Sequence, residues 1–173
     1  MYEILKYTDE VDKSLGLAGM AIALMACNGE RCISSISVED GEDSFSFAPE
    51  AFFASNPRYS AKLAWSQLLD EVHIFSGMLM GNVFCRHLAA SRDLRQEIVD
   101  VVHSLIAEHG AEKCDLDNDE LEILFNKDIR YFHRLFNYPA VAEAARDFAG
   151  TLRIQRRMTA GEAFDYLGRL ISL

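Results

Sequence analysis

The sequence is poor in the residues that divide a chain into separate parts. It holds 3 Pro and 10 Gly in 173 positions, which leaves few places for long loops or for linkers between domains. It also lacks the composition of a disordered protein, because half of its residues are apolar and only a quarter are charged. A chain of this length has enough apolar material to form a core. We therefore expect residues 1–173 to form a single globular domain.

Positive charge is scarce as well. Lys and Arg number 17 against 27 Asp and Glu, and the formal net charge is −10. This charge disfavours binding to nucleic acid and to anionic membrane surfaces, so we expect neither as a partner. The charge is uneven: residues 1–125 hold 9 basic and 22 acidic residues (net −13), whereas residues 126–173 hold 8 and 5 (net +3). The carboxy-terminal part is therefore suited to meet an anion, or the acidic part of this or a neighbouring chain.

Signals for export or membrane insertion are missing. The apolar run Leu15–Cys27 is shorter than the roughly 20 residues that a membrane-spanning helix needs. The first residues mix acids and bases, where a secretory signal would need a basic start followed by an apolar run. The four cysteines, Cys27, Cys32, Cys85 and Cys114, show no paired framework. We therefore expect reduced thiols and a cytoplasmic protein.

Helical patterns cover most of the chain. The first of them is apolar on every side, which is typical of a buried helix, and its small residues Gly16, Gly19 and Ala23 would let a second helix approach closely. We expect Gly110 and Gly150 to end helices, with His109 bonded to the last free carbonyls before Gly110. The expected helices are Asp9–Asn28, Pro57–Ala90, Asp93–His109, Asp117–Phe136, Pro139–Gly150 and Ala160–Ile171, the last with a capping box of Thr159 and Glu162.

One β-hairpin signal interrupts the helices. Residues 32–38 and 44–47 flank Asp40–Gly41, a preferred dipeptide of tight hairpin turns. This loop would pair Ile36 with Phe45 and Ser34 with Phe47, and would leave an apolar face opposite a face of serines. A third strand near Tyr2–Tyr7 is a further candidate. The predicted fold class is mainly α: a helical bundle of about five to six helices with a small inserted β-hairpin.

Asp128 is the strongest candidate for a functional side chain. It projects into the middle of the apolar face of the helix expected at Asp117–Phe136. A carboxylate in such a place must be paired or protonated, because burying it bare costs several kcal/mol. The first interpretation is a structural role, with an Arg, a Tyr or a free backbone amide as partner. The second is a carboxylate with a shifted pKa that lines a cavity and takes part in catalysis.

Arg153, Arg156 and Arg157 form the only dense basic cluster. They precede the helix expected to start after Thr159, where free backbone amides also lie. Arginine side chains beside a helix start can bind a phosphate or a carboxylate, so the three are candidate anion-binding residues. The alternative is that they bond to the preceding helix's carbonyls or pair with nearby Glu and Asp.

Motifs for cofactors and metals are missing. No glycine-rich phosphate loop, GxSxG or HExxH motif occurs. Residues 115–119 resemble the start of a calcium loop, but Glu120 stands where Gly is needed and Asn126 where a bidentate Glu is needed. We prefer Asp117 as a helix N-cap. His and Cys spacings give no zinc pattern, so we expect no cofactor and no metal.

The run Val72–Cys85 is apolar on nearly all faces of its expected helix. That helix would be about 50 Å long, longer than a globule of about 40 Å, so either Gly77 and Gly81 break it or part of it projects into a partner. The first hypothesis is therefore a non-enzymatic, self-associating interaction or regulatory domain, most simply a two-fold dimer, with a further protein partner also conceivable. The second is a small-molecule-binding protein or enzyme with Asp128 in a helical-bundle cavity. The third is an acidic protein that binds a basic partner protein.

Overall fold

The computed structural model describes residues 6–39, 44–48, 61–88 and 94–171. Helices make up most of these residues, and one small antiparallel sheet lies among them, which confirms the mainly α fold class with an inserted hairpin. The elements in chain order are α1 (Glu10–Ala26), η2 (Glu30–Cys32), β1 (Ile33–Ser37), β2 (Phe45–Phe47), α2 (Ala61–Leu88), α3 (Gln96–Cys114), α4 (Asn118–Phe136), α5 (Pro139–Gln155), β3 (Arg157–Thr159) and α6 (Ala160–Leu170).

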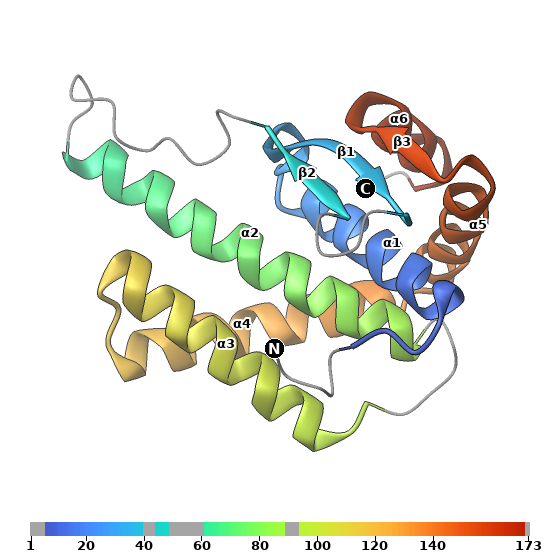
Figure 1. The fold of residues 1–173 in the computed structure, drawn as a ribbon. Helices are drawn as coiled ribbons and strands as arrows, with labels where there is room; N and C mark the ends of the chain where they lie inside the picture. The colour runs from blue at the N-terminus through green and yellow to red at the C-terminus, as the bar shows by residue number, and fades with distance from the viewer. Residues whose placement is uncertain (1–5, 40–43, 49–60, 89–93, 172–173) are drawn as a thin grey trace.

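Helix α2 runs through the middle of the molecule (Figure 1). Helices α3 and α4 pack on one side of it, and α1 packs on the other, between α2 and the layer formed by the sheet, α5 and α6. Its 28 residues give a length of about 42 Å. Gly77 and Gly81 do not break it, because both are buried at contacts with neighbouring helices rather than at a turn. The expected residues 57–60 and 89–90 of this helix lie outside the described ranges.

The apolar run Val72–Cys85 belongs to the core of the chain itself. Met80, Val83 and Phe84 are each at most 3% exposed, and Ile74 and Leu79 are half-buried against the same core. Elements of this chain cover the run on both sides, so its apolar character needs no second molecule to explain it.

The closest helix contact joins α1 to α2. A Cβ placed on Gly19 would overlap the backbone carbonyl of Gly81, and a Cβ on Gly81 would overlap that of Gly19. The sequence-based expectation that small residues of the first helix admit a second helix is therefore confirmed at Gly19. Asp9 caps the start of α1 by accepting the backbone N–H of Asp12.

The amino-terminal half of α1 is fixed to α2 by a buried ion pair. Arg86 donates from Nε to Asp12 Oδ1 at 3.0 Å and from Nη2 to Asp12 Oδ2 at 2.6 Å, with both side chains 6% exposed. Burial would raise the pKa of Asp12, but the hydrogen bonds from Arg86 and from the Thr8 backbone outweigh it, so the pKa is lowered. The Arg86 guanidinium also lies over the Tyr7 ring, 4.9 Å from its centre.

The sheet has the strand order β2-β1-β3, and both pairs are antiparallel. Ile36 pairs with Phe45 as expected, but Phe47 pairs with Ile33 instead of Ser34, because an irregularity between Ile33 and Ser35 shifts the register. This leaves Phe47 45% exposed. The expected turn at Asp40–Gly41 lies outside the described residues.

The third strand is β3, which lies just before the last helix. The strand expected near Tyr2–Tyr7 lies mostly outside the described residues, and Tyr7 is not in a strand. β3 pairs with the second edge of β1, and the serines Ser35 and Ser37 of β1 are buried, at most 6% exposed. Ser35 accepts a hydrogen bond from Arg157 at 3.0 Å.

Two helix ends differ from the expectation. Gly110 and Gly150 lie inside α3 and α5, which continue to Cys114 and Gln155. Gly110 is needed for packing, because a Cβ there would press on Leu121 of α4. The expectation that His109 caps a helix is therefore wrong, and its ring instead stacks on Phe75 with centres 4.1 Å apart. The N-cap at Asp117 and the capping box at Thr159 are confirmed, and Asp117 also forms a capping box with Glu120.

Replacement of Gly81 by Ala should destabilise the protein. The new methyl group meets the backbone of α1, which cannot rotate away, and overpacking of this kind costs about 1–3 kcal/mol or more. Gly150→Ala is the matched control, because its Cβ meets nothing within 4 Å, and it should stabilise α5 by about 0.5–1 kcal/mol. Urea unfolding measures both; a Gly81→Ala protein as stable as the wild type contradicts the contact.

Candidate functional site

Asp128 lies on the face of α4 that packs on α2 and is 1% exposed. Ser76 Oγ of α2 donates a hydrogen bond to its Oδ2 at 2.7 Å, and His73 Nδ1 lies 3.2 Å from each of its two oxygens. The prediction that Asp128 is buried and bonded to a group outside its own helix is confirmed. Its partners differ from the Arg, Tyr or amide that the sequence suggested.

The environment of His73 favours its charged form. The hydrogen bond to Asp128, followed by one to Cys27, raises the pKa of His73 to about 10 and outweighs the opposing effect of burial. At neutral pH His73 is thus protonated beside the Asp128 side chain. His73 and Ser76 are three residues apart, so they lie on the same face of α2 and reach the same carboxylate.

Sequence reasoning missed His73 and Ser76 as partners of Asp128. They lie on α2 and Asp128 lies on α4, and no local spacing brings the two helices together. The usable signal was the polar pair His73 and Ser76 within an otherwise apolar run. Asp128 does not line the hollows that the described residues form beside Met80, His133, Tyr166 and Tyr131, and its place in a catalytic cavity stays a prediction.

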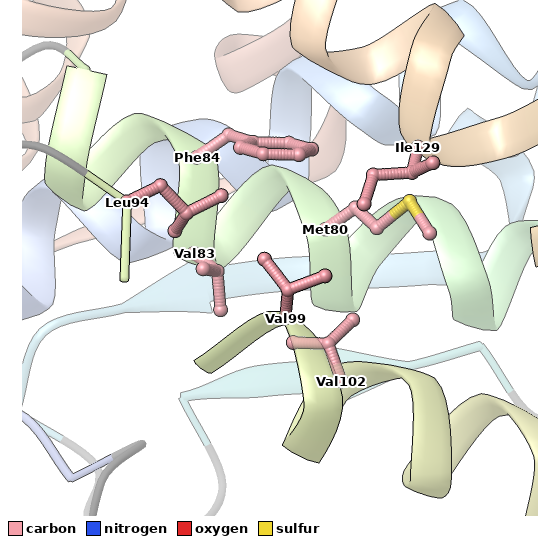
Figure 2. A pocket seen from close by; sticks show the side chains of 7 residues that line it. All are labelled: Met80, Val83, Phe84, Leu94, Val99, Val102 and Ile129. Atoms are coloured by element: carbon pink, nitrogen blue, oxygen red, sulfur yellow. The ribbon is translucent and has the colours of Figure 1, made fainter. Parts of the chain in front are cut away.

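A surface groove lies between α2, α3 and α4. Figure 2 shows a small pocket beside it, where apolar side chains of the three helices and of Leu94 surround a space of about 10 Å³, large enough for about one water molecule. The groove itself has a volume of about 810 Å³. The floor that the two share consists of Phe84, Leu94, Val99 and Ile129.

One wall of the groove is cationic. Arg130, His133 and Arg134 of α4 line it, and Gln96, Asn137 and Tyr138 complete the rim. Among the described residues that line the groove, none is Asp or Glu, although the whole chain carries a net charge of −10. The groove therefore combines an apolar floor with positive charge at its edge. The sequence indicated only the excess of basic residues after position 125.

The three arginines of the predicted anion-binding cluster are used differently from one another. Arg156 donates to Glu10 at 2.8 Å and to Glu39 at 3.0 Å, and Arg157 donates to Ser35. Arg153 is half-buried, and its Nε has no hydrogen-bond partner among the described residues. The contacts of Arg156 fit the alternative interpretation, pairing with nearby acids. Anion binding by Arg153, Arg156 and Arg157 stays a prediction.

Metal ligands do not gather in the described part of the chain. No group of three His, Cys, Asp or Glu side chains there is placed to hold an ion. Within the same residues, no helix is both long enough and apolar enough to cross a lipid bilayer.

Comparison of the chain with protein-family models, with curated proteins and with solved structures gives no match.

The His73–Asp128 pair should make stability depend on pH. The pKa of His73 is about 10 in the folded protein, against an ordinary value of 6.5 in the unfolded chain. The contribution of His73 to the free energy of unfolding is therefore complete below pH 6.5 and is lost as the pH rises through 10. The free energy of unfolding should therefore fall between pH 6.5 and 10 more steeply in the wild type than in His73→Gln. His103→Gln, which removes a half-exposed histidine bonded to Glu122, should keep the wild-type slope. Equal slopes in the wild type and His73→Gln contradict the assignment.

Proposed function

We propose that this chain is a non-enzymatic interaction domain, and that the groove between α2, α3 and α4 binds an acidic, partly apolar helical segment of a partner protein. The proposal rests on the composition of the groove: its described residues form a cationic wall that holds no acid, above an apolar floor, although the chain as a whole is acidic.

The cationic wall supports an acidic occupant. Arg130 and Arg134 are one helical turn apart on α4 and both are exposed, so their guanidinium groups can face one ligand. Guanidinium groups bind carboxylates through paired hydrogen bonds and keep their charge at any physiological pH. The same charges disfavour the basic partner of the third sequence-based hypothesis at this surface.

The apolar floor supports a helical occupant with apolar side chains. Grooves formed between helices bind amphipathic helices through side chains spaced three and four residues apart. Tyr138 is 64% exposed at the rim, and Tyr and Arg are frequent among the residues that contribute most to binding at protein interfaces.

The groove offers little for catalysis. Among the described residues that line it, His133 is the one histidine, and none of them is an Asp, Glu, Cys or Ser. General acid–base and nucleophilic mechanisms both need a second such group within hydrogen-bond reach. The groove is thus suited to binding rather than to reaction.

Charge reversal on the wall should abolish binding of an acidic helix. The probe is a synthetic, fluorescently labelled 16-residue helical peptide with Leu on one face and Glu beside it, measured by fluorescence anisotropy. Arg130→Glu combined with Arg134→Glu should weaken binding at least tenfold, about 1.4 kcal/mol or more. Lys127→Glu is the control, because it makes the charge change of one of these two substitutions on α4 outside the groove, and it should change affinity less than about twofold. Equal binding of a Lys-for-Glu peptide, or no binding of the acidic peptide, overturns the proposal.

Self-association remains a proposal with reduced support. The run Val72–Cys85 is core, so a dimer would depend on the charge difference between residues 1–125 and 126–173. A dimer held by these charges should dissociate as salt screens them. Light scattering at micromolar concentration in low and in 0.5 M salt measures this; a monomer in both removes the proposal and leaves the groove for another protein.

A further inference from the structure

We propose that a second hollow, at the carboxyl ends of α1 and α6, binds an organic ammonium ion with an apolar stem. The hollow has a volume of about 550 Å³ and shares none of its described lining residues with the groove between α2, α3 and α4. The proposal therefore does not depend on what that groove binds.

The fold brings two helix ends to this hollow, because α6 packs against α1 and η2. Met25 and Ala26 are the last residues of α1, and Gly168 and Ile171 stand at the end of α6. The free carbonyl groups at the carboxyl end of a helix carry about half a negative charge, which attracts cations. The last turn of α1 has no basic side chain to offset this charge.

Arg169 is the basic residue in the last turn of α6, but it is not among the residues that line this hollow. Its guanidinium lies over the Tyr166 ring, 5.6 Å from the centre, and its Nε donates to the Asp165 carbonyl at 3.1 Å. These three residues line a different hollow, beside Gln155. A cation from outside the chain can therefore approach the ends of both helices.

Glu30 adds a full negative charge to the hollow. It is the first residue of η2, and it is half-buried. Asp12, Glu71 and Asp128, which are also buried or half-buried, each pair with a cationic side chain. Glu30 has neither a hydrogen bond to its carboxylate nor an ion pair among the described residues. A carboxylate that is partly removed from water favours such a partner, and the described lining of the hollow holds no Lys or Arg to supply it.

The remaining side chains of the hollow suit an ammonium group on an apolar stem. Tyr131 of α4 is exposed there, and its ring packs edge-on against the Phe132 ring with centres 5.0 Å apart. The face of an aromatic ring attracts an ammonium ion. Asn28 supplies an amide oxygen that accepts an N–H, and Met25 and Ile171 supply apolar surface for the stem.

Other classes of ligand fit the hollow less well. An anion would be repelled by Glu30 and by the two helix ends, and a neutral apolar molecule would leave Glu30 without a partner. A metal ion needs several ligating side chains, and within the described residues no group of His, Cys, Asp or Glu is placed to hold one. An ammonium ion on an apolar stem is carried both by free organic amines and by the lysine side chain of another protein.

The probe for a free amine is 2-phenylethylammonium, titrated into the full chain at pH 7 and followed by NMR through the backbone amide signals of Asn28 and Gly168. We expect saturable shifts with a Kd of about 1 mM or lower. The neutral 2-phenylethanol has the same stem without the charge and should bind roughly tenfold more weakly. Equal affinity for the two probes, or no saturable shift with the amine, overturns the proposal.

Two substitutions test the charge and the space of the hollow separately. Glu30→Gln should weaken binding of the amine about tenfold, whereas Glu143→Gln, which removes an exposed carboxylate of α5 outside the hollow, should change it less than about twofold. Gly168→Leu should abolish binding by filling the hollow, and the protein should still fold, because a Cβ there meets nothing within 4 Å.

Gly161→Leu is the control for the second substitution. It adds the same side chain to α6 at a position outside the hollow where a Cβ also meets nothing within 4 Å, so it should keep the wild-type affinity. Wild-type affinity in Glu30→Gln or in Gly168→Leu contradicts an ammonium site in this hollow.

A second probe, Nα-acetyl-lysine methylamide, distinguishes the two sources of the ammonium group. Binding as tight as that of 2-phenylethylammonium, with the same loss in Glu30→Gln, supports the site and identifies the lysine of a partner protein as its occupant. Binding roughly tenfold weaker supports the site with a free amine as its occupant.

Discussion

The close approach of α1 and α2 at Gly19 and Gly81 is the constraint on which the other features depend. At this point each backbone occupies the space where the other residue's side chain would be. Near the start of α1, the close approach places Asp12 against Arg86. At the end of α1, it places Cys27 against Gly77. A wider spacing would separate both contacts, because neither a short carboxylate nor a thiol has the reach to follow.

Two buried carboxylates orient the neighbours of α2. Asp12 of α1 and Asp128 of α4 are both at most 5% exposed, and each bonds to a cationic side chain of α2, Arg86 and His73. Ion pairs of this kind add little net stability over apolar contacts, but they are costly to separate. Their effect is therefore to disfavour arrangements in which α1 or α4 is rotated on α2.

The sequence was informative wherever a pattern is local. Capping residues such as Asp117 and Thr159, the helical periodicities and the pairing of Ile36 with Phe45 all depend on residues a few positions apart. The burial of Asp128 followed from the same periodicity. The partners of Asp128, the third strand and the groove could not be predicted in this way. Each of them brings together residues that are far apart in the sequence. The prediction for Gly110 was wrong for the same reason. The backbone preference of glycine predicts a helix end there, but Gly110 lies within α3, where the lack of a side chain leaves space for Leu121.

The strand order determines when the two strand pairs of the sheet can form during folding. β1 and β2 are near neighbours in sequence, but β1 and β3 bring together residues such as Ser35 and Arg157 that are 122 positions apart. Closing so long a loop carries a large entropic cost, and contacts of this range form late in folding. During synthesis, β1 emerges long before its second partner strand. Until Arg157–Thr159 is made, one edge of β1 has its backbone groups open to other chains, which makes this strand the point of greatest exposure to mispairing in the nascent protein.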